Sequence, residues 1–146
     1  MAAGSVVRIP LQVSRQCVVA SIQVDLTAEV LQQFRADLLE LLHESGSRGV
    51  ILDVSGVQIM DYEDFEVLRR TMAMAALMGA RTVVTGLRAG VVSSLVELGA
   101  DTEDIVAALD LDDAFRVMDE LRSAADDELE EEDNRDYSLG PLADQL

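Results

Sequence analysis

Short apolar runs alternate along the chain with longer segments in which apolar residues recur every three or four positions. A short apolar run is typical of a β-strand, and the longer period is typical of an amphipathic helix. The runs predict strands over residues 6–11, 16–24, 49–54, 81–85 and 105–109. The periodic segments predict helices after Thr27, after Asp61, over residues 91–98 and after Asp112. Strands separated by helices indicate an α/β domain with a partly parallel sheet.

Residues that favour helix ends set the boundaries of the two longest predicted helices. Thr27 is expected to cap the first of these helices, and Gly46 is expected to end it. Asp61 is expected to cap the second, with Asp64 three residues further on, in the manner of a capping box. The second helix then ends before Gly79.

The composition of the chain changes near Ala125. Residues 126–146 hold nine acids against a single base, Arg135, which gives this segment a net charge of −8. A segment so acidic and so poor in large apolar residues cannot offset its ordering entropy by burial. We therefore predict a folded domain over residues 1–125 and a disordered acidic tail over residues 126–146, with a short extension of the last helix allowed at its start.

The charge of the whole chain limits the partners it can bind. Its 146 residues include 28 acids and 11 bases, a net charge of −17, and 49% of them are apolar. This balance argues against binding to the phosphates of nucleic acid and against an anionic membrane surface.

The longest run without strongly polar residues, 72–80, is too short to cross a bilayer. Together with the absence of a signal-peptide pattern, this predicts a cytoplasmic protein.

Residues suited to catalysis or cofactor binding are few. The only histidine, His43, lies near a predicted helix C-terminus, and the only cysteine, Cys17, begins an apolar strand, so neither indicates a catalytic pair. The acids at 110–113 resemble the start of a calcium loop, but Phe115 stands where that loop requires glycine. The chain also lacks a glycine-rich phosphate loop. We predict no enzymatic activity, no metal and no cofactor.

The segment that joins the third predicted strand to the second long helix carries a family resemblance. Its sequence, LDVSGVQIMD, resembles the central segment of STAS domains, the anti-anti-sigma-factor family. Two further segments, VVASIQVDLTAEVLQQF and LMGARTVVTGLRAGVVSSLVELGAD, are similar to RsbS-like STAS domains of the bacterial stressosome. The resemblance covers about residues 5–122. It implies the STAS fold, with a mixed, mostly parallel sheet of four to five strands and about four helices.

The resemblance implies a regulatory scaffold in stress-response signalling. RsbS-like proteins stack with related STAS proteins into a large oligomeric shell that sequesters a switch serine/threonine kinase of the RsbT type. In that family the kinase phosphorylates a serine that follows the motif aspartate, and a phosphate there adds nearly two negative charges to a docking surface. We therefore expect this chain to bind related STAS proteins and such a kinase through Asp61, Tyr62, Glu63 and Asp64.

The chain departs from the family pattern at the phosphoacceptor position. The residue after Asp61 is Tyr62, and a phenol extends much farther from the backbone than the serine hydroxyl that a serine kinase positions. Glu63 and Asp64 follow at once, so the position carries permanent negative charge. One interpretation is that these acids mimic the phosphorylated state or that the switch lies elsewhere. The other is ordinary capping and dipole stabilisation by acids in a first helical turn.

Thr85 is the remaining candidate phosphosite. It ends the strand in the segment VVTG, where related stressosome scaffold proteins carry a phosphoacceptor threonine. The simpler alternative is a β-branched residue in a strand. Two other functions stay open: a stand-alone anti-sigma-factor antagonist outside a stressosome, and a sensor that binds a small ligand at residues 53–61 or at the turn over 85–88.

Overall fold

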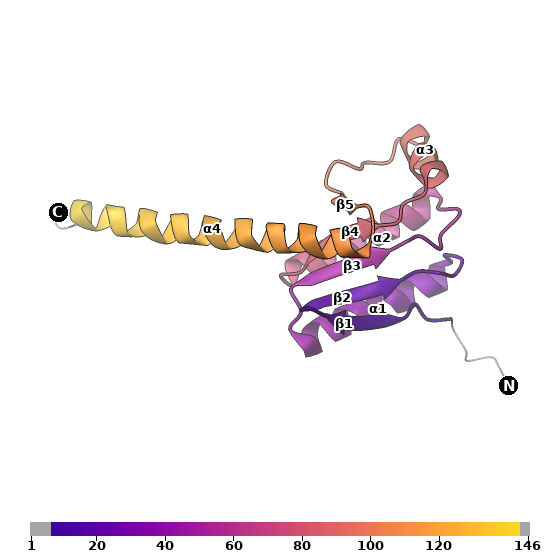
Figure 1. Cartoon of the computed structure of the whole chain (residues 1–146), viewed down its shortest axis with the longest axis horizontal. Coiled ribbons are helices and arrows are strands. Elements are labelled where there is room, and N and C mark those ends of the chain that lie inside the picture. The colour runs from indigo at the N-terminus through magenta and orange to yellow at the C-terminus, as the bar shows by residue number, and fades with distance from the viewer. Residues whose placement is uncertain (1–6, 144–146) are drawn as a thin grey trace.

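The computed structural model describes residues 7–143, with side chains up to Asn134. Within these residues the chain forms five strands and four helices in a regular alternation (Figure 1). In chain order they are β1 (Leu11–Ser14), β2 (Cys17–Ser21), α1 (Ala28–Ser45), β3 (Gly49–Asp53), α2 (Tyr62–Leu77), β4 (Arg81–Thr85), α3 (Ala89–Glu97), β5 (Ala107–Ala108) and α4 (Leu111–Ala143).

The five strands form one mixed sheet in which spatial order follows sequence order, β1-β2-β3-β4-β5. β1 pairs antiparallel with β2, and the remaining neighbours pair in parallel. Parallel neighbours need crossover connections, and α1, α2 and α3 supply them. The predicted α/β fold with a mostly parallel sheet and four helices is confirmed.

Helices cover both faces of the sheet, and each face has its own core (Figure 1). On one face α1, α2 and α3 pack against β2, β3 and β4 around fully buried side chains such as Phe34, Leu38 and Leu52. On the other face Phe115 and Met118 of α4 pack against Ile51 and Val83 together with Cys17. Burial on both sides explains why β3 is an almost continuous apolar run.

The first strand lies later in the chain than the sequence predicts. β1 begins at Leu11, whereas the apolar run predicted a strand over residues 6–11, of which residue 6 lies outside the described residues. Arg15 and Gln16, with φ of 51° and 63°, form a tight turn that pairs β1 with β2. Such turns favour glycine or asparagine, so this hairpin could not be predicted from its turn residues.

Most other element boundaries agree with the predicted ones. Thr27 caps α1, with its Oγ1 accepting from the Val30 N–H at 3.2 Å, and Gly46 ends the helix with a φ of 66°. The cap of α4 is different from the predicted Asp112. Oδ1 of Asp110 accepts from the Asp113 N–H at 2.8 Å, so Asp110 is the cap.

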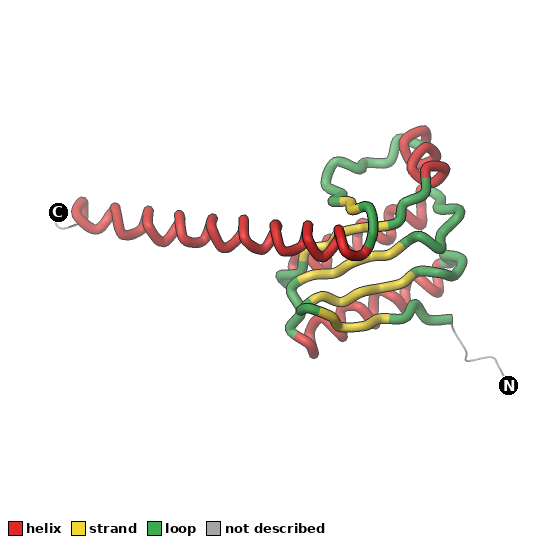
Figure 2. Tube along the Cα trace, viewed as in Figure 1, coloured by secondary structure: helices red, strands yellow, loops and turns green. Residues whose placement is uncertain are grey.

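The acidic segment differs most from its predicted structure. Residues 126–143 of the predicted acidic tail continue α4, and residues 144–146 lie outside the described residues. Figure 2 shows the helix projecting beyond the sheet. Every described side chain from Asp126 to Asn134 is exposed. The prediction considered burial alone. A helix already packed on the sheet can propagate without a new nucleus, and leucine and glutamate favour that extension.

Candidate functional site

The carboxyl ends of β2, β3 and β4 meet at one edge of the sheet because the three strands are parallel. A helix begins beyond each of these ends, so the starts of α1, α2 and α3 belong to the same edge. In open α/β sheets this edge is where ligands and regulatory groups gather.

The start of α2 presents four consecutive residues, Asp61 to Asp64, which we call the docking turn. Asp61 is the N-cap, and its Oδ1 accepts from the Asp64 N–H at 2.7 Å, as predicted. Asp61 and Glu63 are exposed, and 43% of Tyr62 is accessible. The phenol therefore stands on the surface at the phosphoacceptor position of the family pattern, with one carboxylate before it and two after it.

Crowding of the acids alters one of the carboxyls in the docking turn. Partial burial, followed by the nearby charge of Asp61, raises the pKa of Asp64 above its ordinary value. Both causes disfavour the charged form, whereas the helix N-terminus favours it. The docking turn thus concentrates negative charge, and Asp64 is the carboxyl in it whose charged form is disfavoured.

The connection between β3 and α2 is held by hydrogen bonds to the next strand and its turn. Oδ1 of Asp53 accepts from the Ser55 N–H at 3.0 Å, and the Val54 N–H donates to the Thr85 carbonyl at 2.9 Å. Nε of Arg88 donates to the Ser55 carbonyl at 2.9 Å. The ends of β3 and β4 are therefore one hydrogen-bonded unit. Arg88 belongs to the predicted ligand turn over 85–88, but its contact with Ser55 was not predicted, because an arginine beyond a strand carries no signal for a contact 33 residues away.

Thr85 lies within that unit and is almost inaccessible. Its exposed fraction is 2%, and its Oγ1 is buried without a hydrogen-bond partner among the described residues. Its register partner in β3 is Asp53. Gly86 follows with a φ of 80°, and a Cβ there would lie 2.8 Å from Ser55, so the backbones are tightly packed at this point. A kinase cannot reach this hydroxyl unless the strand end opens.

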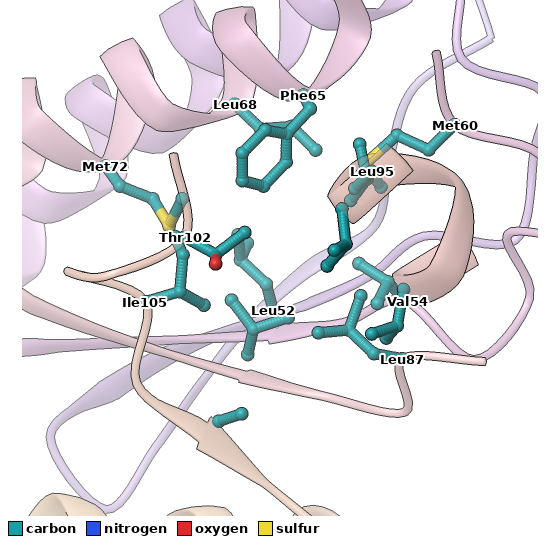
Figure 3. A pocket seen from close by; sticks show the side chains of 14 residues that line it. Leu52, Val54, Met60, Phe65, Leu68, Met72, Leu87, Leu95, Thr102 and Ile105 are labelled. Atoms are coloured by element: carbon teal, nitrogen blue, oxygen red, sulfur yellow. The ribbon is translucent and has the colours of Figure 1, made fainter. Parts of the chain in front are cut away.

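An apolar cavity lies between α2, α3 and the sheet, directly behind the docking turn (Figure 3). It has a volume of ≈ 280 Å³ and is lined by thirteen apolar side chains and Thr102. In Figure 3, side chains of α2 such as Phe65 and Leu68 point toward Leu52 of β3 across this space. The apolar residues over 91–98 predicted a helix but not this cavity, because a pattern of apolar positions cannot distinguish a filled core from a lined cavity.

The sequence-based candidates for catalysis lack an activated environment. Cys17 is buried, and that burial raises the pKa of its thiol, although Arg122 donates to Sγ at 3.0 Å. A protonated thiol is a poor nucleophile. His43 is exposed in the last turn of α1.

In the described part of the chain, no three His, Cys, Asp or Glu side chains gather as metal ligands. Over residues 7–143, none of the helices is both long and apolar enough to span a membrane.

This chain is similar to a known protein family and to several solved structures. A family model for the STAS domain matches residues 8–124. A serine-to-glutamate variant of RsbS from Moorella thermoacetica has a TM-score of 0.69 and 25% identity, over 79% of this chain and 97% of RsbS. A chain of the stressosome, described as a signal integration and transduction hub, has a TM-score of 0.68 and 26% identity, over 77% of this chain and 98% of its own length.

A more distant structure shares the fold alone. The phosphorylated form of the Bacillus cell fate determinant SpoIIAA has a TM-score of 0.56 and 17% identity, over 75% of this chain and 98% of SpoIIAA. No curated protein matches the chain. The family model spans the sheet, its flanking helices and the docking turn, and on that basis the chain belongs to the STAS domain family.

Proposed function

We propose that this STAS domain is a non-enzymatic scaffold of an RsbS-like stressosome. In this role it binds related STAS proteins in a large cytoplasmic assembly and sequesters a switch serine/threonine kinase of the RsbT type. The main support is the likeness to RsbS, which extends over 97% of that protein, so the similarity covers a whole scaffold subunit and not a shared fragment.

The docking turn is proposed as the surface that the kinase contacts. Asp61, Glu63 and Asp64 give it fixed negative charge at a helix start, where a phosphate would place about −2. Ile59, 84% exposed two residues before the cap, adds an apolar contact beside the charge. Exposed carboxylates set the rate and specificity of association, and an apolar anchor adds affinity. The turn therefore has the composition of a constitutive docking surface.

Thr85 is proposed as the remaining phosphoacceptor of the chain. Its burial implies that phosphorylation follows a transient opening of the β4 end and is slow compared with modification of an exposed serine. Tyr62 is exposed, but its phenol has the wrong reach for a serine kinase. In this proposal the domain is a scaffold whose docking turn is always charged and whose modifiable residue is protected.

The proposal is tested with the full chain, an RsbT-type kinase and a related STAS protein. Titration should show binding of the chain to both partners. The triple variant Asp61→Asn, Glu63→Gln, Asp64→Asn should bind the kinase at least tenfold more weakly. Asparagine retains the helix cap, so folding is preserved. A triple variant of exposed acids on α4, Asp126→Asn, Asp127→Asn, Glu130→Gln, removes the same charge elsewhere and should bind as the wild type does.

Incubation with kinase, ATP and magnesium, followed by intact mass and peptide mapping, tests the phosphoacceptor. The wild type should remain unmodified at Tyr62, with slow modification at Thr85, and Tyr62→Ser should gain a rapid phosphate at residue 62. Rapid phosphate on wild-type Tyr62 would contradict the reach argument. Absence of binding to either partner would overturn the scaffold proposal itself.

A second candidate function, a sensor of a small ligand, is favoured by the apolar cavity. Val54 and Met60 from the first predicted ligand segment line it, as does Leu87 from the second. The two functions are compatible, because a scaffold subunit can also carry a ligand site.

A further inference from the structure

The cavity behind the docking turn is poorly suited to water. It has the volume of several water molecules, but Thr102 contributes the one polar side chain among its fourteen described lining residues. An ordered buried water usually needs two to four polar partners, and apolar cavities stay dry or take apolar ligands. An apolar ligand would therefore displace water that has few hydrogen-bond partners on the walls, and would gain contact with those walls.

The wall formed by α3 is the least firmly held. Val91 and Leu95 are its buried residues, whereas Val92 and Val96 line the cavity and are exposed. Its N-cap, Arg88, makes no side-chain cap hydrogen bond within the described structure, and instead bonds to Ser55. With two buried residues against four in α2, α3 is the more thinly packed of the two helices that line the cavity.

We propose that this cavity binds a neutral, medium-chain aliphatic molecule. A dry cavity of about 150 Å³ accepts benzene, so the larger volume here corresponds to roughly ten non-hydrogen atoms. The walls are aliphatic along most of their length, with Phe65 as the one aromatic lining residue in the described part of the chain. An extended alkyl chain fits such a space better than a planar ring.

The charges at the cavity mouth select a neutral head group. Thr102, whose hydroxyl can exchange a hydrogen bond with an alcohol, lines the cavity and is followed or preceded in the sequence by the exposed acids Asp101, Glu103 and Asp104. Arg69 lies 3.6 Å from a carboxylate oxygen of each of the two aspartates, but it is shared with Glu66 at 3.1 Å. The mouth therefore keeps a net negative charge, which disfavours a carboxylate and leaves an alcohol or amide as the fitting head.

Ligand binding would also affect the docking turn, a step that rests on the proposed function. Met60 and Phe65 line the cavity, and they are the residues immediately before and after the turn. An alkyl chain packed against both would fix the start of α2 and change its affinity for the kinase. Val84 and Leu87 extend the same lining to either side of Thr85 and Gly86.

The binding step is tested on the full chain without any partner. Calorimetry and amide NMR with 1-hexanol, 1-octanol, 1-decanol and 1-dodecanol should show affinity rising about fourfold per methylene. The rise should level off beyond a chain of about ten carbons. Amide shifts should concentrate at Met60, Phe65 and Thr102. Decanoate should bind at least tenfold more weakly than 1-decanol. Absence of alcohol binding, or preferential binding of decanoate, would overturn the proposal.

Two variants keep this test sharp. Ala107→Phe fills the cavity from β5 and should abolish binding, whereas Ala124→Phe, on an exposed part of α4, should leave it unchanged. Thr102→Val lies on an exposed loop where folding is not at risk, and it should weaken 1-decanol binding while leaving decane binding unchanged. Equal effects of Ala107→Phe and Ala124→Phe would place the ligand elsewhere and contradict the proposal.

The coupling step is measured by kinase titration at saturating 1-decanol. A change of threefold or more in kinase affinity, lost in Ala107→Phe, would support it. Alcohol binding with unchanged kinase affinity would refute the coupling while leaving the ligand site intact. Loss of kinase binding under all conditions would instead count against the proposed function.

Discussion

The docking turn and Thr85 are two candidate switch positions at one edge of the sheet, but they would meet a new negative charge in opposite ways. At the docking turn the side chains are exposed, and three carboxylates already stand there. Thr85 is buried beside Asp53, and its hydroxyl is unpaired among the described residues. Charge at the first position alters a surface, whereas charge at the second would force the fold itself to open.

The largest expected effect is at the buried position. Thr85→Glu places a larger, charged side chain in a buried site whose register partner is the carboxylate Asp53, and should cost at least about 3 kcal/mol of the free energy of unfolding. Thr85→Val removes an unpaired buried hydroxyl at nearly constant shape, and should leave stability unchanged or raise it by up to about 1 kcal/mol. Urea denaturation measures both. Equal stability of Thr85→Glu and the wild type would show that the strand end opens freely.

A smaller effect is expected at the cap of the docking turn. Asp61→Ala removes the acceptor of the 2.7 Å bond from the Asp64 N–H and should lower the free energy of unfolding by about 1 kcal/mol. Asp61→Asn keeps that bond and should stay within a few tenths of a kcal/mol of the wild type. Thermal and urea unfolding of the pair separates the two roles of Asp61. If both variants lost stability equally, charge and not capping would be its contribution.

The contrast also shows what local sequence can and cannot predict. Asp61 as a cap follows from residues within four positions, so the sequence was sufficient. The burial of Thr85 depends on its register with Asp53 and on packing of β5 and α4, which are set by the whole sheet. The hairpin at Arg15 and Gln16 lacks the residues that normally mark such a turn.

The cavity escaped prediction for a related reason. Val92 and Val96 have the spacing of core residues, and whether a core residue meets a partner depends on how far α3 stands from the sheet. The helical course of the acidic segment up to Ala143 was not predicted, because composition measures the cost of burial but not the ease of extending a helix that is already folded. The fold class can be predicted from the pattern of apolar positions. The cavity depends on how far α3 stands from the sheet, and the exposed end of α4 depends on the helix that is already packed before it.

The smallest expected effect concerns the pH dependence of the docking turn. The pKa of Asp64 is raised by partial burial and by Asp61, so the folded state holds this proton at a pH where the unfolded chain releases it. Between the two pKa values the native state binds more protons, and the contribution of Asp64 to stability falls as pH rises through that window. Asp64→Asn removes the cost of ionising Asp64, so this variant should be more stable than the wild type at pH 7. The gain should be about half a kcal/mol or less, because the turn is largely exposed.

The difference between the two proteins should vanish below the ordinary carboxyl pKa near 3.8, where Asp64 is protonated in both states. Urea unfolding of the two proteins from pH 3 to 7 measures it. A wild type more stable than Asp64→Asn at pH 7, by a difference that shrinks toward acid pH, would mean that the helix dipole outweighs the repulsion from Asp61. The acids would then stabilise the start of α2 as ordinary first-turn residues.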